Sequence, residues 1–280
     1  MAATATLVGR VPVPALFGIS AVFHYLGPAF AVLLFASLST GGVVWLRIAS
    51  AAVVFAVWRG PRKLARLACR PRMVALGLVL AAMNTVFYLA IARLPLATVG
   101  AIEFLGPVLL AAIAVRTPRN AFALVFAVGG VVVLTDLRIV DSPWGFVLAF
   151  ANCAFFVAYV VLGHKVAGAE GIDALGAAML VAAVAVTPYG IGPAVAAFTQ
   201  PLVLLAGIAV GLCSSVIPYV ADQLAMARVR RATFALMLSL LPAMATVIGL
   251  VVLAQRPSLA ELAGIALVIA GVALHREQEN

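Results

Sequence analysis

The chain alternates between long uncharged runs and short polar segments. No Asp, Glu, Lys or Arg occurs from Val11 to Leu46, and another such run extends from Ala174 to Ala221. A helix needs about 20 residues to cross roughly 30 Å of hydrocarbon. Each of these runs is therefore long enough for two membrane-spanning helices, and the shorter runs predict one each.

Turn residues divide the runs into ten expected spans. The segment Ser37–Gly42 separates the first two, and the prolines and glycines from Pro188 to Pro201 predict a loop that divides the run from 174 to 221. The run from 174 to 221 therefore holds the seventh and eighth spans. The remaining eight expected spans cover approximately residues 13–35, 40–58, 73–92, 96–115, 120–135, 143–163, 232–253 and 258–275.

The composition supports an integral membrane protein. Of the 280 residues, 66% are hydrophobic and 10% are charged, which leaves too little polar surface for a water-soluble globule. With 23 Gly and 15 Pro in apolar runs, packed and locally broken helices are favoured over a β-barrel. The fold class expected is all-α, with ten transmembrane helices.

The positive charges predict the orientation in the membrane. If both termini are cytoplasmic, only Arg93, Arg138 and Arg256 lie in outside loops, and Arg47 lies within the second span. The remaining cations are then cytoplasmic: Arg10, Arg59, Arg62, Lys63, Arg66, Arg70, Arg72, Arg116, Arg119, Lys165, Arg228, Arg230, Arg231 and Arg276. This asymmetry follows the positive-inside rule and predicts a multi-pass membrane protein with both termini in the cytoplasm. It also accounts for the net charge of +9 through topology and lipid headgroups, without nucleic acid as a partner.

The two halves of the chain, 1–137 and 138–280, show a weak internal similarity. Asn84 and Tyr88 match Ser215 and Tyr219 at an offset of 131 residues, and their flanking loops carry opposite charge patterns, as expected if the second half is inverted. We therefore expect two inverted five-helix repeats. Such repeats are typical of secondary transporters that bind substrate near the middle of the membrane.

Several segments resemble one transporter family. They are 82–96 (AMNTVFYLAIARLPL), 103–107 (EFLGP), 217–219 (IPY), 231–234 (RATF) and 241–243 (LPA). These residues are similar to the bacterial threonine/homoserine exporter group in the EamA branch of the drug/metabolite transporter superfamily. The resemblance implies ten spans in two repeats and a carrier in the bacterial inner membrane that exports amino acids or related metabolites. One departure is Leu253-Ala254-Gln255, where the family commonly has Leu-Gly-Glu.

Glu103 is the leading candidate for a functional side chain. A charge at the centre of a span costs about 2.5 to 3.5 kcal/mol on insertion scales, so such residues are usually kept for function or for a buried partner. Glu103 is expected to bind a substrate amine or a proton. The alternative is a structural acid that hydroxyl groups or Arg47 satisfy. For Arg47 itself, helix packing or snorkelling to the lipid headgroups is the favoured interpretation.

Six further candidates are expected to line the substrate site. Asn84 and Tyr88 share one face of the third span, with an amide and a hydroxyl suited to a zwitterion. Ser215 and Tyr219 repeat this spacing in the eighth span. Hydrogen bonding between helices is the alternative for both pairs. His24, close to Gly27 and Pro28, is the fifth, with a packing role as its alternative, and Tyr159 in the sixth span completes the expected set.

The sequence disfavours other classes of function. It contains no phosphate-binding GxxxxGK[ST] loop, no GxSxG or HExxH motif and no cluster with metal-ligand spacing, so neither a cofactor nor a metal is expected. The expected function is a secondary transporter that exports small polar amino acids by alternating access, with proton coupling and oligomeric state left open. The alternatives are export of aromatic amino acids, purine metabolites or drugs by the same fold, a membrane enzyme, and a channel.

Overall fold

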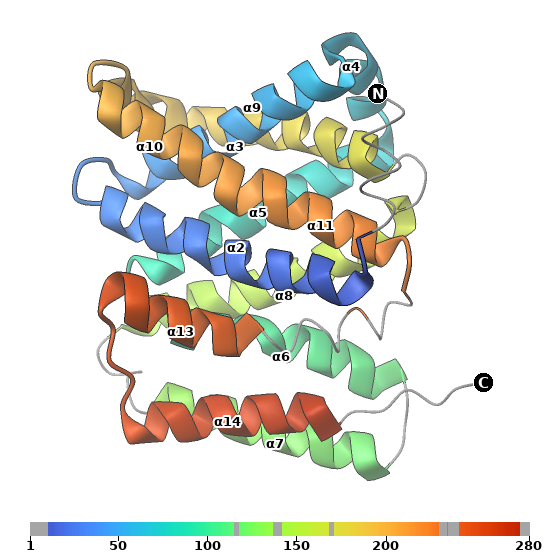
Figure 1. Ribbon diagram of the computed structural model, residues 1–280, viewed down its shortest axis with the longest axis vertical. Helices are drawn as coiled ribbons and strands as arrows, with labels where there is room; N and C mark the ends of the chain where they lie inside the picture. Colours follow the sequence, from blue (N-terminus) through green and yellow to red (C-terminus); the bar gives the residue numbers. More distant parts are fainter. Residues whose placement is uncertain are drawn as a thin grey trace.

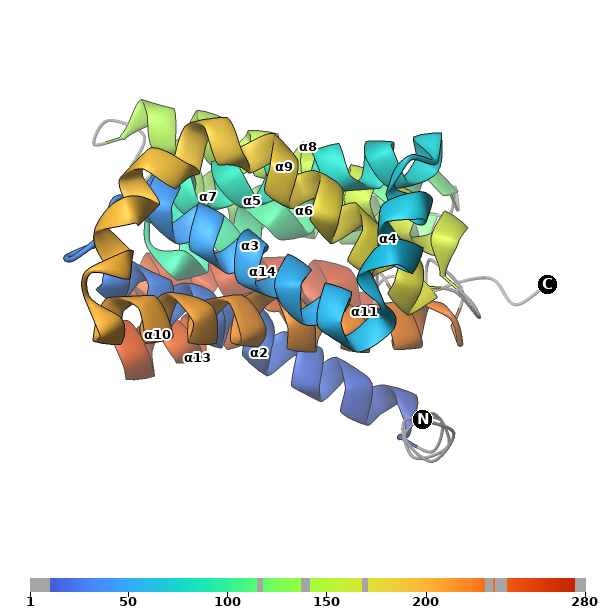
Figure 2. The same ribbon diagram turned by 90° about the horizontal axis from the view of Figure 1, so that it is seen from above.

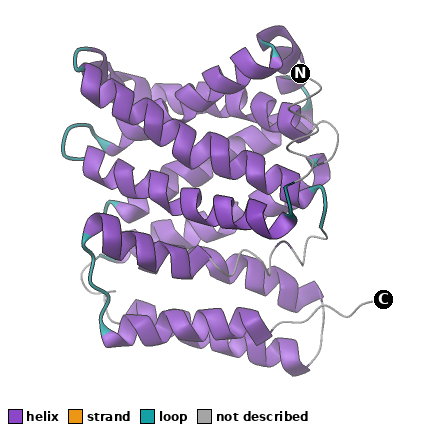
Figure 3. Ribbon diagram, viewed as in Figure 1, coloured by secondary structure: helices purple, strands orange, loops and turns teal. Residues whose placement is uncertain are grey.

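The computed structural model describes residues 11–114, 118–136, 142–167, 171–229, 234 and 241–274. Within these ranges all regular structure is helical and no strand occurs (Figure 3). The helices of the first half are α2 (Val13–Leu34), α3 (Thr40–Arg59), α4 (Pro61–Ala68), α5 (Pro71–Ile91), α6 (Leu96–Ala114) and α7 (Pro118–Asp136). Those of the second half are α8 (Pro143–Val166), α9 (Gly171–Phe198), α10 (Pro201–Gly211), the π-helix η1 (Leu212–Val216), α11 (Ile217–Met226), α13 (Leu241–Leu253) and α14 (Leu259–Leu274).

Six helical segments in the described part are long and apolar enough to cross a membrane. They are Val13–Leu34, Thr40–Arg59, Pro71–Ile91, Pro143–Val166, Gly171–Phe198 and Pro201–Met226. Shorter apolar helices occupy Leu96–Gly106, Leu241–Leu253 and Leu259–Gly271. The expected all-α membrane architecture is confirmed, while the count of ten spans and the inverted repeats stay predictions.

The expected loop from Pro188 to Pro201 is wrong. Helix α9 continues through Pro188 and Pro193 to Phe198, so only Thr199 and Gln200 separate it from α10. A proline removes one backbone hydrogen bond, but neighbouring helices can compensate for this loss in a membrane bundle. Here α3 packs along the same stretch, where Trp45 Nε1 donates to Thr187 Oγ1 at 3.0 Å.

The eighth expected span also extends further than its uncharged run. Helices α10 and α11, joined by η1, form one apolar segment from Pro201 to Met226, which therefore includes Asp222. The side chain of Asp222 is buried. The charge that was expected to end the span thus lies inside the helix bundle.

The helices form a stack in which their axes are roughly aligned while the chain direction alternates (Figures 1 and 2). Helix α3 packs on α9, α5 on α8, α2 on α11, α6 on α13, and α7 on α14. Helix α2 begins and helix α14 ends at the same end of the stack, where the short basic helix α4 also lies (Figure 1, right). The turn between α9 and α10 lies at the opposite end.

This arrangement sharpens the topology prediction. Position 65 in α4 and position 200 in the α9–α10 turn are both exposed and lie at opposite ends of the stack. In a background without Cys69, Cys153 and Cys213, a single cysteine at Gln200 should react with an impermeant reagent added to intact cells. One at Ala65 should react only after the membrane is opened. The reverse labelling pattern would show that the expected orientation is inverted.

Candidate substrate-binding site

A small polar cavity lies among the central helices. Its volume is about 10 Å³, room for about one water molecule. Helices α2, α3, α5, α6, α8 and α11 all contribute to its walls. The lining residues are His24, Pro28, Arg47, Met83, Asn84, Phe87, Glu103, Asn152 and Tyr219.

Glu103 is held at this cavity by two donors from different helices. Its Oε1 accepts a hydrogen bond from Asn152 Nδ2 at 2.9 Å, and its Oε2 accepts one from Tyr25 Oη at 3.1 Å. The carboxyl group is 2% exposed. Asn152 Oδ1 has no hydrogen-bond partner, so one acceptor beside Glu103 is left unused.

Arg47 is fixed on the same cavity by the π-helix. Its Nε donates to Ser215 Oγ at 2.7 Å and its Nη2 to the Ser214 carbonyl at 2.6 Å. Its guanidinium carbon lies 4.9 Å from the ring centroid of Tyr88. Because Arg47 is only 4% exposed, the interpretation as a lipid-snorkelling side chain is wrong. Among the described residues Arg47 forms no ion pair with Glu103, although both line the cavity.

The other expected site residues lie at different depths. Asn84 and Tyr219 line the cavity, and Tyr219 Oη donates to Asn84 Oδ1 at 3.4 Å. His24 lines it as well, and its Nδ1 has no hydrogen-bond partner. Tyr88 and Ser215 are buried behind Arg47 and contact its guanidinium group without lining the cavity.

Tyr159 belongs to a neighbouring group of side chains. Its hydroxyl donates to Asp222 Oδ2 at 3.3 Å, and its ring lies 5.4 Å from that of Tyr219. Ser20 Oγ donates to the other carboxylate oxygen of Asp222. Sequence reasoning missed Asn152, although it is a polar residue in an apolar run as Asn84 is. It missed Asp222 because that residue directly follows an uncharged run.

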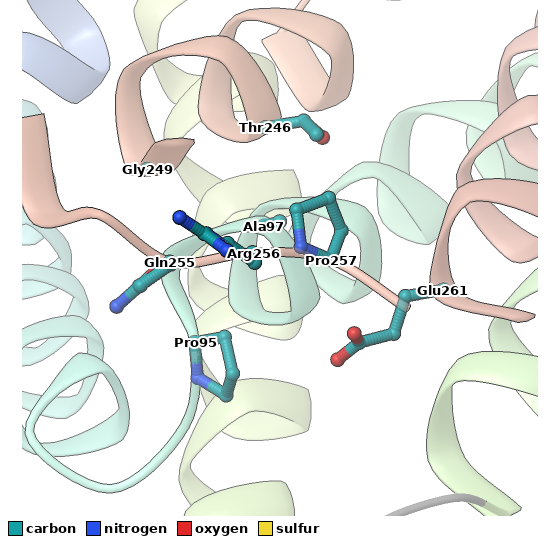
Figure 4. Close-up of a pocket in the computed structure, with 8 residues that line it drawn as sticks. All are labelled: Pro95, Ala97, Thr246, Gly249, Gln255, Arg256, Pro257 and Glu261. Atoms are coloured by element: carbon teal, nitrogen blue, oxygen red, sulfur yellow. The ribbon is translucent and has the colours of Figure 1, made fainter. Parts of the chain in front are cut away.

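A second and larger cavity lies between α6, α13 and the segment that leads into α14 (Figure 4). Its volume is about 220 Å³, and Gln255, Arg256 and Glu261 contribute polar groups to it. Gln255, at the position where the sequence departs from the exporter pattern, accepts a hydrogen bond from the backbone N–H of Leu96 at 3.1 Å. None of the seven expected site residues lines this cavity.

Comparison with known proteins identifies relatives over most of the chain. The sequence pattern of the EamA-like transporter family matches residues 143–276. The threonine/homoserine exporter RhtA of Salmonella typhimurium (strain SL1344) is 32% identical over 235 residues, which cover 82% of this chain and 79% of the exporter. RhtA of Escherichia coli (strain K12) is 30% identical over 250 residues, 87% of this chain and 84% of the exporter.

Solved structures share the fold. One of them superimposes with a TM-score of 0.63 at 20% sequence identity, and the match covers 94% of this chain and 96% of the other. At this identity the likeness supports the arrangement of the helices only.

The close contact between α2 and η1 can be tested at Gly27. A Cβ atom at this position would lie 2.4 Å from Ser214 Cβ and 2.8 Å from Ser214 Cα, so Gly27→Ala must push η1 away from α2. We expect a loss of about 1 to 3 kcal/mol in the free energy of unfolding, the usual cost of overpacking. Denaturant titration of the purified protein in detergent measures this change.

Gly18→Ala on the same helix is the matched control. A Cβ atom there meets nothing within 4 Å, so the substitution should leave stability unchanged or raise it by about 0.5 to 1 kcal/mol through helix propensity. Equal effects of the two substitutions would contradict the tight α2–η1 contact.

Proposed function

Because the chain belongs to the EamA-like transporter family, we propose that it exports a small polar amino acid, such as threonine or homoserine, across the bacterial inner membrane. The proteins of this family are transporters and not enzymes. The relatives named above are threonine/homoserine exporters, which supports the class of cargo. In this proposal the cargo crosses by alternating access.

The observation that carries this proposal is a pair of opposite charges on one cavity. Arg47 and Glu103 both line it, and each is bound by neutral partners instead of by the other. An amino acid at neutral pH is a zwitterion, with a carboxylate and an ammonium group on the same carbon. Such a molecule could place its carboxylate against Arg47 and its ammonium group against Glu103.

The neighbouring polar atoms suit the same ligand. Asn152 Oδ1 has no partner beside Glu103 and could accept a hydrogen bond from the ammonium group or from a side-chain hydroxyl. Asn84 and Tyr219 form the wall close to these groups. A cavity of about 10 Å³ does not hold an amino acid, so the described conformation is closed and binding requires the helices to move apart.

Helix packing supports the proposed repeats at 1–137 and 138–280. If α2, α3, α5, α6 and α7 correspond to α8, α9, α10–α11, α13 and α14, exchanging the halves turns each major contact between these helices either into itself or into another observed contact. The α5–α8 contact becomes α11–α2, and the α6–α8 contact becomes α13–α2. Both carboxylate sites involve α2 and α8, which are equivalent under this exchange. Two arrangements of equivalent halves are the usual basis of alternating access.

The cavity also favours a second candidate cargo. The rings of His24, Phe87 and Tyr219 contribute to its walls, and ring surfaces of this kind suit an aromatic side chain. Aromatic amino acids carried by the same fold are therefore the main alternative. Efflux from proteoliposomes loaded with threonine, homoserine, phenylalanine or tryptophan separates the two cargo classes.

The assignment of Glu103 predicts the effect of its neutral isostere. A hydrogen bond to a charged group contributes about 1.5 to 3 kcal/mol, so Glu103→Gln should reduce threonine efflux per folded molecule by about 10- to 100-fold. Abundance and melting temperature should stay close to those of the wild type, because the amide keeps the shape of the carboxyl group. Efflux from proteoliposomes, normalised to folded protein, is the measurement.

Glu261→Gln provides the matched control. Glu261 is another buried acid, but its Oε2 accepts a hydrogen bond from the backbone N–H of Ser258 in a helix-capping arrangement that glutamine also supports. Its efflux should equal that of the wild type. Normal efflux by the Glu103→Gln variant, or lost stability with normal efflux per folded molecule, would make Glu103 a structural acid.

A further inference from the structure

Asp222 is a second carboxyl group that lies inside the bundle and outside the proposed substrate site. It is 1% exposed, and it belongs to a membrane-spanning segment. It does not line the central cavity. A buried acid in such a segment is costly and usually has a function.

In the part of the chain that the structure describes, the two groups that hydrogen-bond to Asp222 are both hydroxyls. Ser20 Oγ donates to its Oδ1 and Tyr159 Oη to its Oδ2. A hydroxyl group can donate to a carboxylate and, after rotation, accept from a carboxylic acid. Both protonation states of Asp222 can therefore be hydrogen-bonded without rebuilding the site. Glu103 differs, because Asn152 turns an amide NH₂ group toward it, which favours the ionised form.

The charges of the centre leave Asp222 without a counter-ion. Arg47 and Glu103 balance each other across the cavity, and among the described residues no cation pairs with Asp222. The smallest ligand that neutralises a buried carboxylate is a proton. A sodium ion would need several oxygen ligands, whereas two hydroxyl groups are the hydrogen-bond partners here.

The other ionisable groups around α11 are engaged elsewhere or lie to one side. His24 of α2 and Tyr219 of α11 line the central cavity, and their ring centroids lie 6.1 Å apart. Asp173 at the start of α9 pairs with Arg59 and Lys63. On α8, His164 contacts the Val160 carbonyl and the ring of Phe234.

The two carboxyl groups are linked through the same pair of helices. Helix α2 supplies Ser20 to Asp222 and Tyr25 to Glu103, and helix α8 supplies Tyr159 to Asp222 and Asn152 to Glu103. At 1.5 Å per residue, the donor pairs are separated by roughly 7 to 11 Å along these helices. A shift of α2 or α8 that frees one carboxyl group therefore disturbs the other.

The helix that carries Asp222 is locally irregular. The π-helix η1 leads directly into α11. Its residues Ser214 and Ser215 accept hydrogen bonds from Arg47. Single-turn π-bulges occur frequently at functional sites. A movement of α11 at Asp222 is thus transmitted through η1 to the guanidinium group on the cavity.

We infer that Asp222 is the proton-binding site that couples amino-acid export to proton entry, separate from the substrate site at Glu103. The inference rests on the proposed export function. One proton binds a carboxylate oxygen of Asp222 in the outward-open state and leaves to the cytoplasm in the inward-open state. The ammonium group of the substrate stays the ligand of Glu103.

Proteoliposomes separate these two roles. In Asp222→Asn, exchange of labelled for unlabelled threonine at equal pH should stay within about threefold of the wild type, while acceleration by an imposed pH gradient should disappear. Glu103→Gln should lose exchange as well. Glu261→Gln should retain both activities. An imposed sodium gradient should not accelerate transport by any of these proteins.

Three outcomes of these measurements would overturn the inference. Asp222→Asn could respond to the pH gradient as the wild type does, or it could lose exchange and coupling together while folded. Acceleration by sodium that Asp222→Asn abolishes would assign the site to that cation instead.

If Asp222→Asn does not fold, Ser20→Ala and Tyr159→Phe replace it. Each removes one partner of the carboxyl group and should shift the pH at which coupled transport is half-maximal, and an unchanged pH profile in both would contradict the inference.

A readout without substrate distinguishes failure of this inference from failure of the proposed function. Infrared difference spectra of the wild type between acidic and alkaline pH should show the C=O band of a protonated carboxyl group. The band should vanish in Asp222→Asn and persist in Glu103→Gln. Its persistence in Asp222→Asn would refute proton binding at Asp222, whichever cargo the protein carries.

Discussion

The packing around the central cavity depends on one buried cation. Arg47 lies inside an apolar bundle, where an unsatisfied guanidinium group would be costly. Three groups satisfy it. The hydroxyl of Ser215 and the carbonyl of Ser214 belong to the π-helix, and the third group is the ring of Tyr88. The close approach of α2 and α3 to this region requires glycine. A side chain at Gly27 would collide with Ser214, and one at Gly211 with Ser50 and the Arg47 carbonyl. These contacts hold the guanidinium group where it can face a ligand.

Glu103 completes this arrangement as the acidic group on the wall of the same cavity. Tyr25 and Asn152 satisfy its carboxyl group, so it does not need Arg47 as a partner. Two opposite charges that are kept apart, each already hydrogen-bonded, form a site complementary to a zwitterion. Asp222 repeats the pattern of a carboxyl group held between α2 and α8, but its two partners among the described residues are hydroxyls. The difference in partners is the physical basis for assigning one acid to cargo and the other to a proton.

Much of this organisation could be predicted from the sequence, and the failures have identifiable causes. Uncharged runs located the membrane helices, because burial in lipid excludes charge. The turn residues, in contrast, misplaced the end of α9, since packing of Trp45 and α3 against Thr187 and Gly190 lets the helix continue through Pro188 and Pro193. The uncharged runs also made Asp222 a boundary, although Ser20 and Tyr159, distant in sequence, hydrogen-bond that carboxyl group inside the bundle.

Only part of the candidate site could be predicted from the sequence. Polar residues in apolar runs identified Glu103, Asn84 and His24, which line the cavity together. The orientation of Arg47 toward the cavity depends on η1, a local distortion that no periodicity in the sequence indicates. For the same reason, Tyr88 and Ser215 were expected in the cavity but lie behind Arg47 as its contacts.

The central claim is that the zwitterion lies between Arg47 and Glu103, and one measurement tests it directly. Solid-state NMR on the protein in lipid, with threonine labelled at nitrogen and the glutamate carboxyl carbons labelled with ¹³C, reports the distance from the bound ammonium group to Glu103. The account predicts a dipolar contact of about 3 to 4 Å, the range of an ion pair, that is absent from Glu103→Gln. Saturated binding of threonine without this contact would contradict the account.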